Sequence, residues 1–208
     1  MLKLILNRYL LFGLVLNLIM ITSLDIEYIS IYVFNIFSVV SYYFLLYSAW
    51  SKPDSYFNRS RLGLVVVFYS FFSVFAFNAI SYYFNGNYFV FNESDALFYH
   101  DFAARIVDLP VADGFKFFLL RSRGSLEDFG AILVISSLYK IVVSNLIVNI
   151  FYVLIGVQTS LAIYRIGSNF MSRKYAFLSA LTYSTSSFVL YFHATGLKET
   201  IMIFFIVF

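Results

Sequence analysis

The run LGLVVVFYSFFSVFAFNAISYY, at positions 62–83, contains no charged side chain and constrains the fold more than any other feature of the sequence. A helix needs about 20 apolar residues to cross the hydrocarbon core of a membrane, and this run is long enough. Backbone polar groups in lipid must be satisfied within a helix or a closed barrel. Because the run lacks the apolar–polar alternation of barrel strands, it predicts a transmembrane α-helix.

The composition of the whole chain agrees with this prediction. Its 208 residues are 62% hydrophobic and 12% charged, whereas soluble domains are about 45–50% apolar and roughly 25% charged. The absence of cysteine excludes disulfides, thiolate metal sites and cysteine nucleophiles. No P-loop, dinucleotide fingerprint, nucleic-acid motif or Ser-His-Asp arrangement is visible. We therefore expect membrane lipid as a partner and no nucleic acid.

The apolar runs predict five transmembrane spans and the start of a sixth. The five runs occupy residues 9–24, 28–50, 62–83, 142–164 and 176–192. Residues 131–139 are too few to cross and predict a half-helix at one membrane surface. The final IMIFFIVF predicts a sixth span that is cut short, so we expect the chain to be incomplete at its C-terminus. Asn145 and Asn149 in the fourth run are interpreted as hydrogen-bonding residues between helices.

The expected fold class is therefore an all-α, multi-pass transmembrane bundle that forms a single domain over residues 1–208. Residues 1–84 hold three spans, and residues 131–208 hold the half-helix, two spans and the start of the sixth. Residues 85–130 between them form a loop far longer than the 12–15 residues beyond which loops are usually functional or disordered. This loop is rich in Phe, Leu and Val, so we expect amphipathic helices lying on the membrane surface.

Charge distribution predicts the orientation of the chain. The loops on the N-terminal side hold one acid, Asp54, and eight bases: Lys3, Arg8, Lys52, Arg59, Arg61, Arg165, Arg173 and Lys174. The opposite side holds the other six bases and ten acids. An excess of Lys and Arg in short loops marks the cytoplasmic side. We therefore expect a cytoplasmic N-terminus in the inner membrane and an extracytoplasmic loop at 85–130.

The segment NESDALFYHDFAARI, at positions 92–106, gathers scarce ionisable groups in that outer loop. On a helix, Asp95, Tyr99 and Phe102 share one face, and Asp101 and Arg105 form an i, i+4 ion pair. Asp95 has two readings. Either Asp95 or Ser94 simply caps the helix, or Asp95 is a general base that takes a proton from an attacking hydroxyl. In the second reading, partial burial against Tyr99 and Phe102 would raise its pKa.

Two further stretches carry candidate binding residues. GFKFFLLRSRG, at 114–124, is typical of an interfacial helix whose bases either reach toward lipid headgroups or, as Arg121 and Arg123, grip a phosphate. FHATGLKET, at 192–200, forms a second outer loop that we expect beside the first. His100 could help Asp95 hold a divalent metal, but a lone histidine among scattered acids lacks ligand spacing, so no metal ligands are assigned. The residues assigned to substrate binding are Tyr99, His100, Arg121, Arg123, His193 and Lys198.

The order of these features resembles the polytopic glycosyltransferases of the C superfamily, including bacterial relatives described as dolichyl-phosphate-mannose-protein mannosyltransferase-like. The acidic motif that opens the first large outer loop of that family is matched by SDALFYH at 94–100. The surface half-helix, a basic inner turn and a second outer carboxylate are matched by 131–139, RIGSNFMSRKYA at 165–176 and GLKE at 196–199. The resemblance covers residues 85–208.

The resemblance implies a polyprenyl-phosphate sugar as donor and inverting transfer to a glycan or lipid acceptor on the outer face, in surface polysaccharide or glycoconjugate assembly. Asp95 would be the catalytic carboxylate and Glu199 the second catalytic acid. A polysaccharide repeat-unit polymerase remains an alternative. So does a flippase or transporter of lipid-linked oligosaccharides, although the spans carry little of the intramembrane charge that marks transport pathways.

The predicted orientation can be tested on a chain that has no native cysteine. Ser94→Cys is expected to react with a membrane-impermeant maleimide added to intact cells, and Ser60→Cys is expected to react only after the cells are lysed. Labelling in the reverse order would show that the orientation is wrong.

Overall fold

The computed structural model describes residues 36, 39–41, 43–45, 47, 52–86, 95–121 and 126–208. Across these ranges the regular structure is helical and includes no strand, which agrees with the predicted all-α class. The first two expected spans lie almost wholly outside the described residues. From residue 52 on, the elements are η2 (Asp54–Tyr56), α3 (Arg59–Asn85), α4 (Asp95–Ile106), α5 (Val111–Arg121), α6 (Leu126–Tyr139), α7 (Asn145–Gly167), α8 (Arg173–Thr185), α9 (Ser187–Thr195) and α10 (Lys198–Val207).

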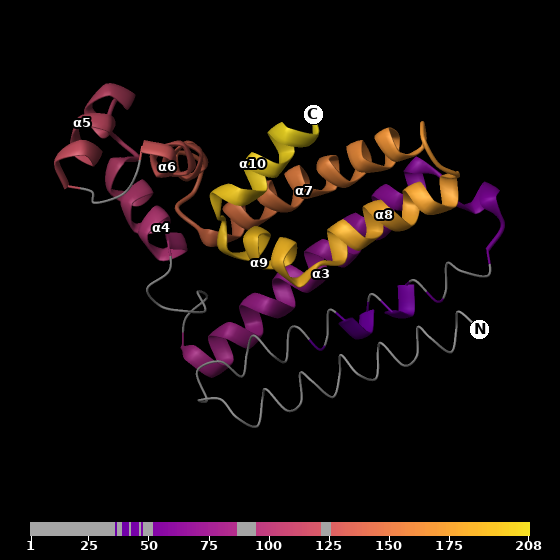
Figure 1. Cartoon of the computed structure of the whole chain (residues 1–208). Helices are drawn as coiled ribbons and strands as arrows, with labels where there is room; N and C mark the ends of the chain where they lie inside the picture. The colour runs from indigo at the N-terminus through magenta and orange to yellow at the C-terminus, as the bar shows by residue number, and fades with distance from the viewer. Residues whose placement is uncertain are drawn as a thin grey trace.

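The helices form two groups (Figure 1). In the first, α3, α7 and α8 run side by side, with α7 antiparallel to α3, and α9 and α10 pack at the end where α7 begins. In the second, α4 and α5 both pack against α6 at that same end. Contacts of α6 with α7 and α10 join the two groups. The described parts of the predicted outer segment, 95–121 and 126–130, are thus helical, as expected, and with the rest of α6 they dock on one end of the bundle.

Two helices, α3 and α7, are long and apolar enough to cross a membrane, and they match the third and fourth expected spans. Capping side chains mark where each begins: Asn58 Oδ1 accepts from Arg61 N, and Ser144 Oγ accepts from Leu146 N. Such caps satisfy amide groups that lack a partner in the first turn. The bent pair α9–α10 would raise the number of spans to three among the described residues. A membrane protein is therefore supported by these helices, and five spans are not confirmed.

The fifth expected span, 176–192, is wrong as a single helix, because the chain breaks at Ser186 between α8 and α9. Ahead of the break, the hydroxyls of Thr182, Ser184 and Thr185 each donate to the carbonyl four residues earlier, at 2.8–2.9 Å. Such bonds compete with the helical ladder and bend helices. Ser186 itself takes an extended conformation, with φ −60° and ψ 130°. A polar cluster that hydropathy treats as neutral is thus the cause of the break.

The second sharp feature is the turn between α9 and α10, where the two axes meet at 119°. Gly196 occupies the left-handed region, with φ +69°. A Cβ at this position would also lie 2.8 Å from Val148 Cγ1. Glycine is therefore required both by the backbone and by the close approach of α7. The predicted outer loop 192–200 is accordingly corrected to the end of α9, a tight turn and the start of α10.

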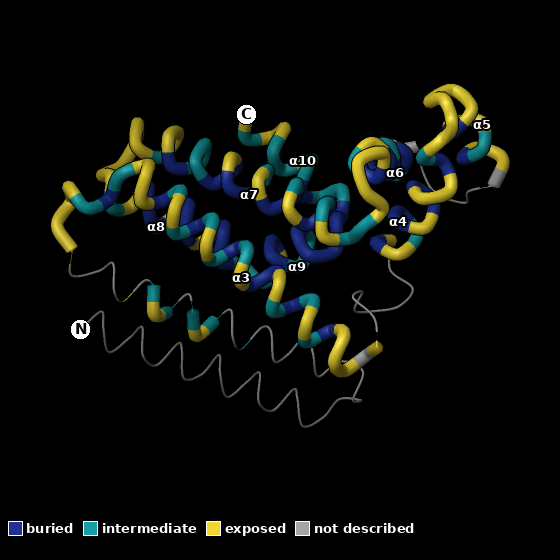
Figure 2. The backbone as a smooth tube through the Cα atoms, turned by 180° about the vertical axis from the view of Figure 1, so that it is seen from behind, coloured by how far each residue is buried: buried dark blue, intermediate teal, exposed yellow. Residues whose placement is uncertain are grey.

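Burial follows the two groups of helices (Figure 2). One core lies among η2, α3, α7, α8 and α9, with Phe57, Leu62, Phe77 and Leu181 almost completely buried. The second lies under α4, α5 and α6 and reaches α7 through Tyr152. Because the second core continues into α7, the surface unit is held by apolar packing on the bundle as well as by its own helices.

One face of α3 is apolar and exposed over the first half of the helix. Leu64, Phe68 and Phe72 recur at spacings of four residues, and each is more than half exposed. That spacing places them on one stripe of the helix. In a helix that crosses a membrane, such a stripe fits contact with lipid tails, whereas the opposite face packs against α7 and α8.

Six of the eight bases predicted to be cytoplasmic lie at the end of the bundle remote from α4–α6, and the other two, Lys3 and Arg8, lie outside the described residues. There η2, the start of α3, the end of α7 and the start of α8 come together (Figure 1). Tyr164 donates to the carbonyl of Phe57 at 2.9 Å, and the Lys174 amide donates to Asp54 Oδ1 at 3.3 Å. The only acid predicted on this side therefore ties two basic segments together.

Gly156 in α7 provides a test of the packing of α9. A Cβ there would lie 2.1 Å from Cε1 of His193, a side chain that is 1% exposed and has little room to move. Gly156→Ala is expected to destabilise the fold by about 1–3 kcal/mol through overpacking. Thermal unfolding in detergent micelles measures this effect.

The matched control is Gly130→Ala in α6, where a Cβ meets nothing within 4 Å. It is expected to leave stability unchanged or slightly higher. The double variant Gly156→Ala, His193→Ala should recover part of the loss. Equal stability of the two glycine variants would show that α9 does not pack on α7 as described.

Candidate functional site

The most connected polar residue in the described part of the outer unit is Asp128, in the first turns of α6. Its Oδ1 accepts a hydrogen bond from the Tyr99 hydroxyl at 2.7 Å and another from Lys198 Nζ at 2.8 Å. The side chains of Lys198 and Asp128 are only 19% and 16% exposed. Hydrogen bonds that involve a charged group are shorter and stronger than neutral ones. One carboxylate therefore links α4, α6 and α10.

Two further carboxylates act on the same tyrosine. The pKa of the Tyr99 hydroxyl is raised, first by burial, then by its hydrogen bond to Asp128, and then by the negative charges of Asp128, Asp95 and Glu199. Each of those acids is therefore close enough to Tyr99 to interact with it electrostatically. They come from three different helices. We call Asp95, Tyr99, Asp128, Lys198 and Glu199 the carboxylate cluster.

Glu199, in the first turn of α10, faces the start of α7. It interacts electrostatically with Tyr152, which is completely buried. Oε2 of Glu199 and the hydroxyl of Tyr152 are both buried, and neither has a hydrogen-bond partner among the described residues. Buried polar atoms are rarely left without partners in native proteins, and exceptions often mark binding sites. This side of the cluster therefore has unused capacity to bind a polar ligand.

His100 holds the cluster against the α9–α10 turn. Its Nδ1 and the Tyr139 hydroxyl of α6 share a hydrogen bond, and the ring also bonds the backbone of Thr195. A Cβ on Gly196 would lie 3.1 Å from His100 Nε2. Burial lowers the pKa of His100 to about 4, so the ring is neutral at neutral pH. The expectation that the two outer segments lie side by side is confirmed here.

The two acids of α4, Asp95 and Asp101, are both exposed. Asp95 is the first residue of the helix and is exposed, so the expected partial burial against Tyr99 and Phe102 is wrong. The predicted ion pair of Asp101 with Arg105 is confirmed, at 2.6 Å on the exposed face. Asp95 is therefore the acid of α4 that both reaches the cluster and remains open to solvent.

Besides His100, three residues predicted to bind substrate are not part of the carboxylate cluster. His193 is buried against Gly156 of α7, inside the bundle, and is not a surface residue. Arg123 lies outside the described residues, and for Arg121 only the backbone, at the end of α5, is described. The phosphate grip expected from these two arginines stays a prediction.

Asp128 and Tyr152 were not identified as site residues from the sequence. Asp128 was one of ten outer acids with no distinguishing neighbour, and its partners lie 29 and 70 positions away. Tyr152 stood among many aromatic residues of an apolar run. The sequence offered one signal for Asp128, its position at the start of a short apolar helix. Acids are common at helix N-termini, so this position does not by itself mark a functional site.

The carboxylate cluster offers three carboxylates and one ammonium group on a partly buried surface. An exposed carboxylate such as Asp95 can accept a proton from a hydroxyl, and an ammonium such as Lys198 has three donors, so it can bind an anion while it stays paired. No group of three or more His, Cys, Asp or Glu side chains placed to hold a metal ion occurs within the described ranges.

Comparison with models of protein families, with curated proteins and with solved structures finds no match to this chain.

The buried, neutral state of His100 predicts a pH dependence of stability. Its pKa is about 4 in the folded chain, against about 6.5 when unfolded, so the unfolded chain binds more protons between these values. Stability is then complete above about pH 6.5 and falls as the pH drops toward 4, by about 3 kcal/mol in total. Unfolding in detergent at pH 7, 5.5 and 4 measures this loss.

His100→Gln keeps a polar side chain and removes the titration, so the difference between wild type and variant isolates the contribution of this residue. A loss of stability between pH 7 and pH 4 that is equally large in the variant would contradict the assignment.

Proposed function

We propose that the chain belongs to a membrane glycosyltransferase that moves a sugar from a polyprenyl-phosphate donor to a glycan or lipid acceptor at the extracytoplasmic face. The observation that carries the proposal is the carboxylate of Asp128, which accepts hydrogen bonds from Tyr99 at 2.7 Å and from Lys198 at 2.8 Å. Asp95 and Glu199 lie within electrostatic range of the same tyrosine. A general base, an anion-binding ammonium and a further carboxylate are the groups that such a transfer uses.

In the proposed reaction Asp95 accepts the proton of the acceptor hydroxyl while the hydroxyl oxygen attacks the anomeric carbon of the donor sugar. The bond from that carbon to the phosphate oxygen breaks, and the polyprenyl phosphate leaves with the electron pair. Attack opposite the leaving group inverts the anomeric centre. Lys198 stabilises the charge on the departing phosphate, and Asp128 holds the ammonium in place through the contact at 2.8 Å.

Glu199 is proposed to orient the sugar rather than to move a proton. Its Oε2 is buried and has no partner among the described residues, so it can accept a hydrogen bond from a sugar hydroxyl. Tyr99 is almost fully buried and donates to Asp128, which suits a residue that positions Asp128 better than one that contacts substrate.

The proposed topology places this chemistry on the outside. In this proposal the chain has a cytoplasmic N-terminus and crosses the membrane three times before residue 85, then through α7, then through α8 and α9 with a break at Ser186. The basic end of the bundle then lies in the cytoplasm, and α4–α6 lie on the outer surface of the inner membrane. The separation of basic and acidic loops along the sequence supports this orientation. The short apolar helix α6 fits a position at the membrane surface, because it is too short to cross.

Transport of a lipid-linked glycan is a second candidate, favoured by one observation. The helix interrupted at Gly196, with Glu199 in the first turn after the interruption, has the form that many transporters use at their binding sites. A transporter would need Glu199 more than Asp95, because Asp95 is exposed at the start of a surface helix.

The test is Asp95→Asn, assayed in membranes from cells that express the chain, with radiolabelled polyprenyl-phosphate glucose and polyprenyl-phosphate mannose as donors. Loss of the base is expected to lower transfer at least about 100-fold, while the amount of protein in the membrane stays normal. Asp101→Asn, on the exposed face of the same helix, is the matched control and should keep nearly full activity.

Transfer that survives Asp95→Asn would remove this residue from the mechanism. Absence of transfer by the wild type, together with movement of the labelled lipid between leaflets that depends on Glu199, would favour the transporter.

A further inference from the structure

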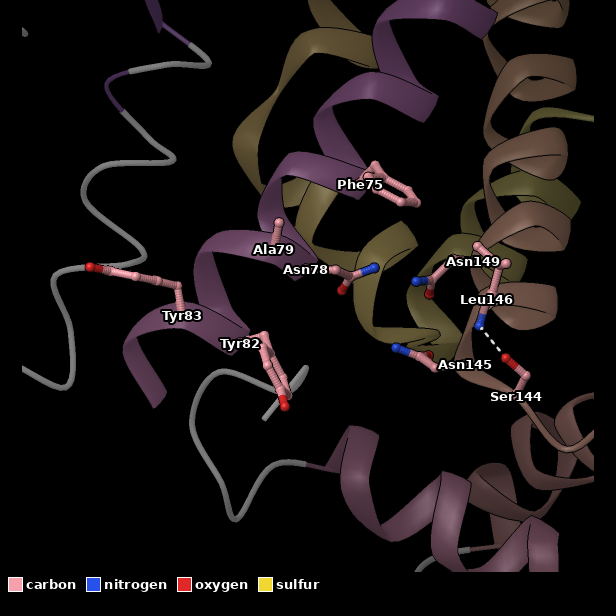
Figure 3. Close-up of a pocket in the computed structure, with 9 residues that line it drawn as sticks. All are labelled: Phe75, Asn78, Ala79, Tyr82, Tyr83, Ser144, Asn145, Leu146 and Asn149. Carbon is pink, nitrogen blue, oxygen red and sulfur yellow. Dashed lines mark hydrogen bonds between the residues drawn. The ribbon is translucent and has the colours of Figure 1, made fainter. Parts of the chain in front are cut away.

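A pocket of about 820 Å³ lies between the end of α3 and the start of α7, at the end of the bundle that carries the cluster (Figure 3). This is within the range of 300–1,000 Å³ that is usual for ligand sites. Its lining residues are Phe75, Asn78, Ala79, Tyr82, Tyr83, Ser144, Asn145, Leu146 and Asn149.

Three carboxamides converge on this pocket. Asn78 from α3 and Asn145 and Asn149 from α7 point toward one another across it (Figure 3). The Oδ1 atom of each is buried and has no hydrogen-bond partner among the described residues, and the side chain of Asn149 is 3% exposed. The sequence interpretation of Asn145 and Asn149 as hydrogen-bonding residues between helices is therefore not supported, because among the described residues neither side chain bonds another helix. Their acceptors are instead available to a ligand.

The rim of the pocket is aromatic. Phe75 and Tyr82 are both more than half exposed and stand on α3 beside Asn78, whereas the ring of Tyr83 points away from the asparagines (Figure 3). Carboxamides offer both donors and acceptors, which suits hydroxyl groups, and exposed rings suit the apolar C–H face of a sugar. No Lys, Arg, Asp or Glu is among the described lining residues, so the lining suits an uncharged ligand better than a phosphate.

The pocket adjoins the carboxylate cluster through α7. Asn149 precedes Tyr152 by three residues, which is nearly one turn, and Tyr152 interacts with Glu199. A Cβ on Gly196 would lie 2.8 Å from Cγ1 of Val148, so the turn that precedes Glu199 also packs on this part of α7. Asn149 therefore lies within about one turn of the residue through which α7 interacts with Glu199.

We propose that this pocket binds an uncharged sugar ring of a lipid-linked glycan, with its hydroxyls on Asn78, Asn145 and Asn149 and its C–H face against the aromatic rim. That this sugar belongs to the acceptor rests on the proposed function. The binding site itself rests on the pocket, the carboxamides and the rings alone.

The probe is a photoreactive octyl glucoside, added to the purified chain in phosphatidylcholine nanodiscs, with a photoreactive octanol of the same reactive group as the comparison. The glucoside is expected to label peptides of α3 and α7 at the pocket at least five times more than the octanol does. Excess unlabelled octyl glucoside should abolish the difference, and glucose 6-phosphate should not.

Asn149→Leu keeps the branching and the number of side-chain heavy atoms but removes the polar groups, and it is expected to reduce the glucoside labelling at least five-fold without changing the octanol labelling. Tyr82→Ala, at an exposed rim position, gives a second variant that does not disturb the core. The matched control is Asn169→Leu, on the exposed turn after α7, which should label as the wild type does. Equal labelling by glucoside and octanol, or undiminished labelling in both pocket variants, would show that the pocket holds a lipid chain and overturn the proposal.

The two proposals fail separately. Selective labelling in a chain that transfers no sugar would retain the binding site and remove the enzyme. Transfer that depends on Asp95, without selective labelling, would retain the enzyme and remove this site.

Discussion

A largely buried lysine needs an anion beside it, and in this chain the pair of Lys198 and Asp128 meets that need. Removing one partner of a buried ion pair is strongly destabilising, because the other charge is left without compensation. The pair joins α10 to α6, and Tyr99 adds α4 through the same carboxylate oxygen. The only polar link among the described residues that joins α4, α6 and α10 at once is therefore this one acidic side chain, which acts together with the apolar core beneath it.

The bundle supplies the conditions under which this cluster can form. Gly196 lets α10 turn back at 119°, and the close approach of α7 at that turn brings Tyr152 beside Glu199. The apolar core under α4–α6 continues into α7, so the cluster is fixed on two sides. The proposed sugar pocket begins one turn earlier on α7. A donor phosphate near Lys198 and an acceptor sugar near Asn149 would thus be positioned by one continuous set of helices.

Hydropathy and helical periodicity predicted the parts of the fold that depend on local sequence: α3, α7, the short helix α6 and the ion pair of Asp101 with Arg105. They failed where tertiary contacts or local hydrogen bonds of hydroxyl groups determine where a helix ends or what a side chain contacts. The break at Ser186 comes from hydroxyls that bond backward along α8, which a hydropathy window does not register. The role of Asp128 depends on partners 29 and 70 positions away. Asp95 was predicted as a candidate catalytic residue, but its expected partial burial is wrong. Asp95 is exposed because it is the first residue of α4 and lies at the edge of the outer unit.

The most direct test of this account is a double-mutant cycle on Asp128 and Lys198. Asp128→Leu, Lys198→Met and the combined variant are compared with the wild type by their free energies of unfolding in bicelles. Each substitution is expected to lower the free energy of unfolding more in the wild type than in a chain that already carries the other substitution. The difference, which is the coupling energy, is expected to be about 1–3 kcal/mol. Strictly additive effects, with a coupling below about 0.5 kcal/mol, would show that α6 and α10 are not joined by this pair and would contradict the placement of the cluster.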